Sequence, residues 1–264
     1  YLEALGSLDG VVPLELDVRD RAQIERAKRI IESEGTGLYG LVNNAGVGLL
    51  GQLSTFTDED LHNIFDVNVF GPHRMTNAFL DMLLESQGRV VNIGSQGGQI
   101  AMAFYGPYTM TKHALEAYTT ALNQEVAPHG MRACIVQPGG ISTHIGANMI
   151  EGTKRMLQRA QPPFDEAAQQ VLEALENPAP FDPEQPESAT NRNPSSPEIV
   201  TEAVVDALFA PNPRERYLVG TRWEGNRVIN STLQKLLDAN ACKSLNYSRE
   251  ELIQKLDEEI EWKN

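Results

Sequence analysis

Cysteine is nearly absent from this 264-residue sequence, and long apolar runs are missing altogether. The two cysteines, Cys134 and Cys242, are too few for a disulfide framework or a zinc site. A reducing compartment fits best, and we expect a cytoplasmic protein. No stretch reaches the roughly 18 apolar residues of a membrane-spanning helix, so we expect no membrane span. The five histidines show no metal-ligand spacing, which argues against a metal site.

Basic residues are also scarce. There are 22 Lys and Arg against 36 Asp and Glu, and the formal net charge is −14. A protein that binds phosphate backbones needs a basic surface, so we expect no nucleic-acid partner. Residues 1–10 lack the basic and apolar regions of a secretory signal. The length allows one substantial core, and we expect a single domain over residues 1–264.

Short apolar runs alternate with longer segments of helical periodicity, which is typical of a parallel sheet covered by helices on both faces. The predicted strands are residues 11–16, 40–43, 89–93, 132–136 and 217–219. The predicted helices are residues 19–34, 58–85, 108–127, 164–175 and 197–209. The fold class is therefore α/β with a doubly wound parallel sheet, and its site should lie at the carboxyl ends of the strands.

Two segments stand outside this alternation. Residues 176–197 are rich in Pro, Asn, Glu and Ser and predict a surface loop, either a mobile lid over a substrate or a solvated connector. Residues 221–264 predict a C-terminal helical extension. Its last helix should begin at a capping box formed by Ser248 and Glu251.

Tyr108 and Lys112 lie four residues apart on a predicted helix and so share one face. An ammonium about 4 Å from a phenol contributes roughly 4 kcal/mol at an effective dielectric of about 20, or about three pKa units. The pair therefore predicts a Tyr108 pKa near neutrality and a phenol fit for proton transfer. Ser95 follows the strand at 89–93, where its hydroxyl could donate to a carbonyl oxygen.

Three further motifs lie along the chain. Leu-Val-Asn-Asn-Ala-Gly at 41–46 ends a strand, Asp-Val-Asn at 66–68 lies in a helix, and Pro138-Gly139 follows a later strand. Together with Ser95 and Tyr-x-x-x-Lys, they resemble the short-chain dehydrogenase/reductase family from Leu14 to about Gly220. The hydroxysteroid and retinol dehydrogenase branch is the most similar. The resemblance implies a Rossmann-like fold and NAD or NADP as cofactor.

The resemblance also implies roles for individual residues. Tyr108 would be the general acid/base, Lys112 would lower its pKa and hold the nicotinamide ribose, and Ser95 would orient the substrate oxygen. The backbone carbonyl of Asn68 would hold a water in a proton relay to the lysine. The other implied cofactor contacts are Asp17, Val18, Asn43, Ala45, Gly46, Pro138, Ile141 and Thr143. A further group could either line a substrate pocket or be ordinary packing residues: His144, Ile145, Met149, Ala101, Met102 and Phe104.

Pro72 bears on the relay directly. It lies four residues after Asn68, so the N–H that would bond the Asn68 carbonyl in an α-helix is missing. We expect a kink there and a carbonyl free to bind water. The other interpretation is that Pro72 merely bends a helix around the core.

The Gly-rich phosphate loop of the family is absent from residues 1–264, together with the βαβ unit that would carry it. In the strand order 3-2-1-4-5-6, the predicted strand at 11–16 would then lack a neighbour. We therefore expect that the natural protein carries this unit upstream of residue 1. The same unit holds the residue that separates NAD from NADP, so the preference is not readable.

The implied function is an NAD(P)-dependent oxidoreductase that interconverts an alcohol and a ketone or aldehyde, with a hydrophobic small molecule as one option for the substrate. The alternative is a non-catalytic binding or scaffold protein of the same fold that has lost cofactor binding. An enoyl reductase fits poorly, because Tyr108 and Lys112 are four rather than seven residues apart. The family often forms homodimers or homotetramers through helices that resemble 58–85 and 108–127.

Overall fold

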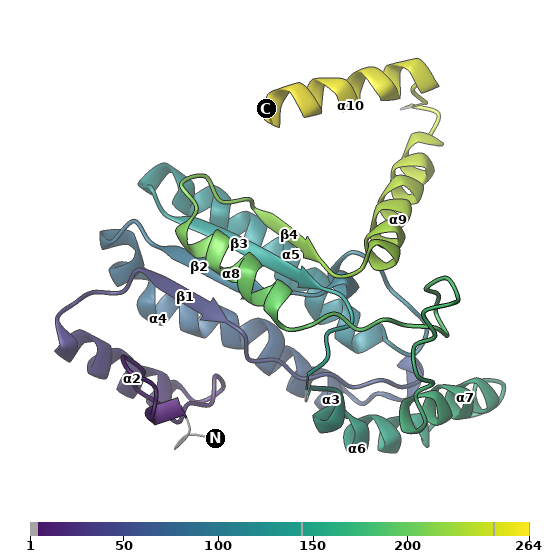
Figure 1. Cartoon of the computed structure of the whole chain (residues 1–264), viewed down its shortest axis with the longest axis horizontal. Helices are drawn as coiled ribbons and strands as arrows, with labels where there is room; N and C mark the ends of the chain where they lie inside the picture. The colour runs from purple at the N-terminus through teal and green to yellow at the C-terminus, as the bar shows by residue number, and fades with distance from the viewer. Residues whose placement is uncertain (1–4, 144, 245, 264) are drawn as a thin grey trace. The chain divides into compact units, whose positions relative to one another are not determined.

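A computed structural model describes residues 5–143, 145–244 and 246–263 of the chain, and its centre is a parallel sheet (Figure 1). The strands lie in the order β1 (Gly40–Asn43), β2 (Arg89–Ile93), β3 (Arg132–Pro138) and β4 (Arg216–Val219). Every neighbouring pair is parallel. The carboxyl ends of the four strands therefore meet at one edge, as the sequence predicts.

Helices connect these strands and cover both faces of the sheet (Figure 1). Those in the first part of the chain are α2 (Arg21–Glu34), α3 (Asp58–Phe65), α4 (Gly71–Glu85) and α5 (Gly106–Val126). They are followed by α6 (Ile145–Leu157), α7 (Asp165–Glu176), α8 (Glu198–Phe209), α9 (Arg222–Asn240) and α10 (Arg249–Lys263).

The core has two parts because successive strand residues point to opposite faces. On one face, Val90 of β2 packs in a cluster with Phe79 and Leu83 of α4. On the other face, Val91 packs in a cluster with Ala207 of α8. Burying such a side chain contributes about 1.5–3 kcal/mol, so both faces favour a continuous apolar strand.

The chain divides into two compact units, residues 1–225 and 226–264. The first unit holds the sheet as a single domain, and the second holds most of α9 and all of α10. The capping box predicted for α10 is confirmed: Glu251 N donates to Ser248 Oγ (3.2 Å) and Ser248 N donates to the Glu251 carboxylate (2.7 Å). Within the described parts of the chain, no helix has both the length and the apolar character to cross a membrane.

The strand predicted at residues 11–16 is wrong, because the structure has no strand there. A buried strand needs a neighbour for its backbone N–H and C=O groups. β1 is the edge of the described sheet, and residues 11–16 do not pair with it. Val11, Val12 and Leu14 are accordingly exposed. The apolar run is present, but an apolar segment forms a buried strand only where a neighbouring strand pairs with its backbone.

The single helix predicted at 58–85 is two helices joined by a π-helical turn at Asp66–Phe70. α3 begins at a capping box between Thr57 and Asp60. α4 resumes after the turn with Pro72 in its first turn. The helix is thus interrupted just before the proline, and the kink itself stays a prediction.

Candidate active site

A cavity of about 400 Å³ lies at the carboxyl ends of β1, β2 and β3. The structure brings together there seven of the residues predicted from sequence: Gly46, Ser95, Tyr108, Lys112, Pro138, Ile141 and Thr143. Residues that the sequence analysis missed also line the cavity: Asn44, Val47, Ile93, Gly94, Gly139, Pro197, Val200 and Thr201. His144 lies outside the described residues.

Tyr108 and Ser95 converge on one side of this cavity. α5 begins at Gly106, which places Tyr108 in its first turn, while Ser95 precedes the short 3-10 turn at Gln96–Gly98. The Ser95 Oγ accepts a hydrogen bond from Gly97 N (3.0 Å) and is also hydrogen-bonded to Tyr108. A Cβ at Gly97 would lie 3.4 Å from both Ser95 Oγ and Tyr108 Cε1. This glycine therefore leaves room for the two side chains to meet.

Lys112 lies one helical turn beyond Tyr108 and is only 6% exposed. Its Nζ donates to the Ile93 carbonyl at the end of β2 (2.8 Å) and lies 5.7 Å from the centroid of the Tyr108 ring. Burial lowers the pKa of Lys112 to about 8, and the nearby Glu116 carboxylate opposes part of that shift. The ammonium is thus anchored beside the phenol at a pKa well below its usual range.

The structure corrects the expected acidity of the phenol. Burial raises the pKa of Tyr108 above its ordinary value, and the hydrogen bond with Ser95 offsets only part of this rise. Desolvation of the phenolate therefore dominates, and Tyr108 is protonated at neutral pH.

Asn68 lies in the π-helical turn and is 1% exposed. Its Oδ1 accepts from Val47 N (2.8 Å), and its Nδ2 donates to Val47 O (2.8 Å) and to Thr111 Oγ1 (3.0 Å). A Cβ at Gly46 would lie 3.6 Å from Asn68 Oδ1 and 3.9 Å from Lys112 Nζ. The Asn68 side chain therefore fixes the rim of the cavity next to the lysine.

Two of the predicted contacts, Asn43 and Ala45, do not line the cavity. Asn43 is buried, and its Nδ2 donates to Asn92 Oδ1 (2.8 Å) and Thr76 Oγ1 (3.4 Å) in the core. Ala45 is exposed. Asn44, the second residue of the asparagine pair, lines the cavity instead. Alternation of side chains along a strand could have indicated this, because adjacent asparagines point to opposite sides.

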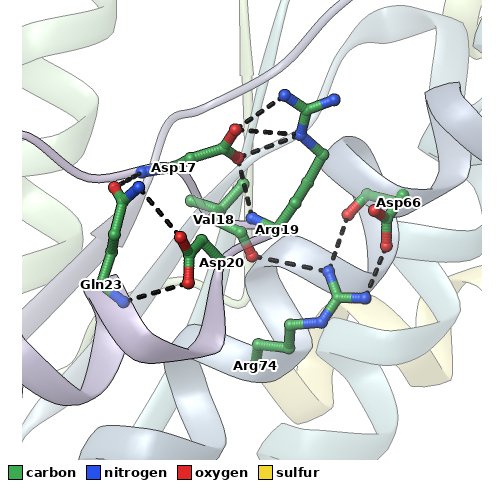
Figure 2. A network of polar contacts seen from close by, with 7 residues as sticks. All are labelled: Asp17, Val18, Arg19, Asp20, Gln23, Asp66 and Arg74. Atoms are coloured by element: carbon green, nitrogen blue, oxygen red, sulfur yellow. Dashed lines mark hydrogen bonds and ion pairs between the residues drawn. The ribbon is translucent and has the colours of Figure 1, made fainter.

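Asp17 also lies outside the cavity lining. Its carboxylate accepts hydrogen bonds from the backbone and guanidinium of Arg19, and its backbone N–H donates to Gln23 Oε1 at 2.8 Å (Figure 2). These bonds to Arg19 lower the pKa of Asp17 to about 2. The carboxylate is therefore ionised at any ordinary pH and already paired with a cation.

Val18, which the family resemblance also implies as a cofactor contact, packs against the start of α4. A Cβ at Gly71 would lie 2.7 Å from Val18 Cγ2, so the two segments touch. Arg74 donates to the Val18 carbonyl (3.5 Å) and pairs with the Asp66 carboxylate (2.5 Å), as Figure 2 shows. Asp17 and Val18 thus belong to a polar network beside the π-helical turn.

Met149, which was expected to line a substrate pocket, is not among the residues that line this cavity. A Cβ at Gly48 would lie 2.8 Å from Met149 Sδ and 3.5 Å from Tyr108 Cδ2, so both side chains converge on this glycine. Among the described residues, no group of three or more His, Cys, Asp or Glu side chains is placed to hold a metal ion.

Comparison with known sequences identifies the family. A family model described as "short chain dehydrogenase" matches residues 2–154. The chain belongs to the short-chain dehydrogenase family. Its cavity gathers the serine, tyrosine and lysine that the sequence analysis related to this family.

Two curated relatives illustrate how similar the chain is in sequence to known dehydrogenases. The mitochondrial D-beta-hydroxybutyrate dehydrogenase of Bos taurus is 31% identical over 215 residues, which cover 79% of this chain and 62% of that protein. Retinol dehydrogenase 5 of Homo sapiens is 38% identical over 146 residues, or 54% of this chain and 45% of that protein. The chain thus spans less than two thirds of the length of these relatives.

A solved structure supports the same assignment of fold. A short-chain dehydrogenase from Streptomyces avermitilis superposes with a TM-score of 0.70 at 25% sequence identity, covering 91% of this chain and 82% of that one. The parallel sheet with flanking helices is therefore the Rossmann-like fold of the short-chain dehydrogenases.

Proposed function

We propose that this chain is the catalytic part of an NAD(P)-dependent oxidoreductase that interconverts an alcohol and a ketone or aldehyde. The observation that carries the proposal is the convergence of Tyr108, Ser95 and Lys112 on one cavity at the carboxyl edge of the sheet. Relatives of the chain are dehydrogenases of D-beta-hydroxybutyrate and of retinol. Both names denote oxidation of an alcohol, the chemistry to which these three side chains are suited.

The cavity fits the nicotinamide end of the cofactor. Lysine carries three N–H donors, and the bond to the Ile93 carbonyl uses one of them. The other two would hold a ribose hydroxyl of the cofactor and stabilise charge on the Tyr108 oxygen. Gly46 has no side chain, so the cofactor could approach its backbone closely. Pro138 and Ile141 supply an apolar wall for the planar nicotinamide ring. When bound, NAD(P) accepts or supplies the hydride.

In carbonyl reduction, the protein must stabilise charge on the substrate oxygen and deliver a proton to it. Ser95 orients that oxygen by donating its hydroxyl hydrogen, because the Oγ already accepts from Gly97 N. Tyr108 is protonated at neutral pH and gives its proton to the same oxygen. The Lys112 ammonium then stabilises the phenolate that remains. In alcohol oxidation these steps run backwards.

Reprotonation of Tyr108 needs a path from solvent. The backbone carbonyl of Asn68 is a water site on that path. In an α-helix the N–H of residue 72 would donate to this carbonyl, but Pro72 has no N–H.

Apolar residues of the cavity, including Val47, Ile141 and Val200, favour a hydrophobic substrate. A homodimer or homotetramer remains a prediction from the family resemblance.

The test is a reductase and dehydrogenase screen with both cofactors, comparing wild type with Tyr108→Phe. Loss of the acid/base should reduce turnover by about 10²- to 10⁴-fold while nicotinamide fluorescence still reports cofactor binding. Tyr39→Phe is the matched control, because Tyr39 stacks on Phe209 at the opposite end of β1 and its ring is retained. Unchanged turnover in Tyr108→Phe would remove Tyr108 from the mechanism. Absence of cofactor binding by wild type would favour the scaffold alternative.

A further inference from the structure

A buried carboxylate lies behind the cavity wall formed by residues 138–143. Glu224, in the first turn of α9, is 1% exposed. Its Oε1 accepts from Gly140 N (2.7 Å), and its Oε2 accepts from Thr221 N (3.2 Å). A side chain at Gly139 would collide with this carboxylate, so glycine there allows the wall to approach it. Glu224 thus binds the backbone of the cavity wall without lining the cavity itself.

Arg192 supplies the positive charge that the buried carboxylate requires. Its Nη2 forms an ion pair with Glu224 Oε1, and its guanidinium stacks on Trp223 with Cζ 4.9 Å from the ring centroid. A buried ionised carboxylate is costly unless a cation and hydrogen bonds compensate it. Arg192 belongs to the segment at 176–197 that the sequence describes as either a lid or a connector.

The same segment is joined to the cavity wall through its backbone. Ser142 N donates to Ser195 O (2.9 Å), and Ser195 N donates to Gly140 O (2.8 Å). Ile141 and Ser195 form a parallel bridge between the two segments. Ile141 also lines the cavity, so this pairing adjoins the site. The part of the segment at Ser195 is therefore paired with the backbone of the cavity wall.

We propose that Arg192, Glu224 and the Ser195 pairing form a latch that positions residues 138–143 at the cavity. The inference rests on the function proposed above and names Arg192 and Glu224 as positioning residues for that reaction. They act through the backbone of Gly140 and hold one wall against the bound nicotinamide and substrate. A displacement of about 1 Å in such a wall can cost about 100-fold in rate.

Hydrogen–deuterium exchange of the full-length protein tests the latch whether or not a substrate is known. In Arg192→Met and Glu224→Gln, the amides of Gly140, Ser142 and Ser195 should exchange at least about tenfold faster than in wild type. Glu224→Gln retains the size of the side chain, so the test stays valid if Arg192→Met impairs folding. Unchanged exchange in both variants would overturn the proposal.

The matched control is Arg159→Met. Arg159 forms an exposed ion pair with Asp60 of α3 (2.8 Å), an interaction that involves no atom of residues 138–143. Its substitution should leave exchange at Gly140 and Ser195 at the wild-type rate. Faster exchange there in Arg159→Met as well would show a general loosening of the fold and would contradict a specific latch.

Kinetic measurements show whether Arg192 positions the cavity wall for the reaction or only stabilises the fold. Arg192→Met should lower kcat by about 10- to 100-fold, with a smaller change in the KM for cofactor. The pH profile should keep its shape, because Tyr108 and Lys112 are unchanged. Faster exchange with unchanged kcat would refute the positioning role. If wild type turns over no substrate while exchange responds as expected, the proposed function fails and the latch is supported.

Discussion

At the scale of single residues, burial decides the charge states of the site. Tyr108 and Lys112 both lose hydration in the first turns of α5, and burial favours the neutral form of each. The pKa of Tyr108 therefore rises and that of Lys112 falls to about 8. Helical spacing predicted that the two side chains are neighbours. It could not predict the direction of either shift, which depends on how completely the fold covers them.

These shifts set the expected pH dependence of carbonyl reduction. Lys112 should lose its proton as the pH rises through about 8, rather than near its ordinary value of 10.5. Reduction uses the ammonium and the protonated Tyr108, so kcat/KM should be highest below about pH 8 and fall above it. In Lys112→Arg the charge persists at alkaline pH, and the fall should disappear even if the maximum rate is lower.

Profiles of kcat/KM between about pH 6 and pH 10 measure this effect. His113→Gln is the control on the same helix, because the His113 ring bonds the Thr109 carbonyl (2.8 Å) and does not line the cavity. It should retain the wild-type profile. A Lys112→Arg profile that still falls near pH 8 would show that another group controls the alkaline limb.

At the scale of elements, the sequence predicted where strands lie better than it predicted which strands pair with one another. Residues 40–43 and 89–93 are strands within the predicted bounds, since each apolar run ends at turn-forming residues. Residues 11–16 are equally apolar but lack a neighbouring strand. α8 contributes Val200 and Thr201 to the cavity through packing on the sheet, which local periodicity does not reveal.

A buried polar ladder joins β1, β2 and α5. Asn43 Nδ2 donates to Asn92 Oδ1 (2.8 Å), and Asn92 Nδ2 donates to Thr119 Oγ1 (2.8 Å). Asn92 is 0% exposed, so water cannot replace either bond. Asn92→Ala should lower the free energy of unfolding by about 2–3 kcal/mol, because it leaves the Asn43 amide short of an acceptor in the core.

Urea unfolding measures the loss, with Asn77→Ala as the control. Asn77 is exposed on α4, where its amide contacts the His73 ring (3.1 Å). Substitution there should cost no more than about 0.5 kcal/mol. Equal destabilisation by the two variants would mean that the ladder adds nothing beyond an ordinary surface contact.

At the scale of the whole molecule, the site and the second unit are separate in sequence. Every residue that lines the cavity lies between Asn44 and Thr201, within the unit of residues 1–225. The family model also ends well before the C-terminal extension, at residue 154. The extension could be predicted from sequence as a helical segment, but its place outside the sheet domain required the structure.

Two truncations should therefore differ sharply. Removal of residues 241–264 leaves the sheet and the latch intact, so the thermal transition should shift by no more than about 4 °C and cofactor binding should be retained. A chain that ends at Gly220 also loses Glu224, which bonds Gly140 and pairs with Arg192. It should unfold at a distinctly lower temperature and show faster amide exchange at Gly140. If removal of residues 241–264 alone abolishes cofactor binding, the sheet domain does not function independently of α10.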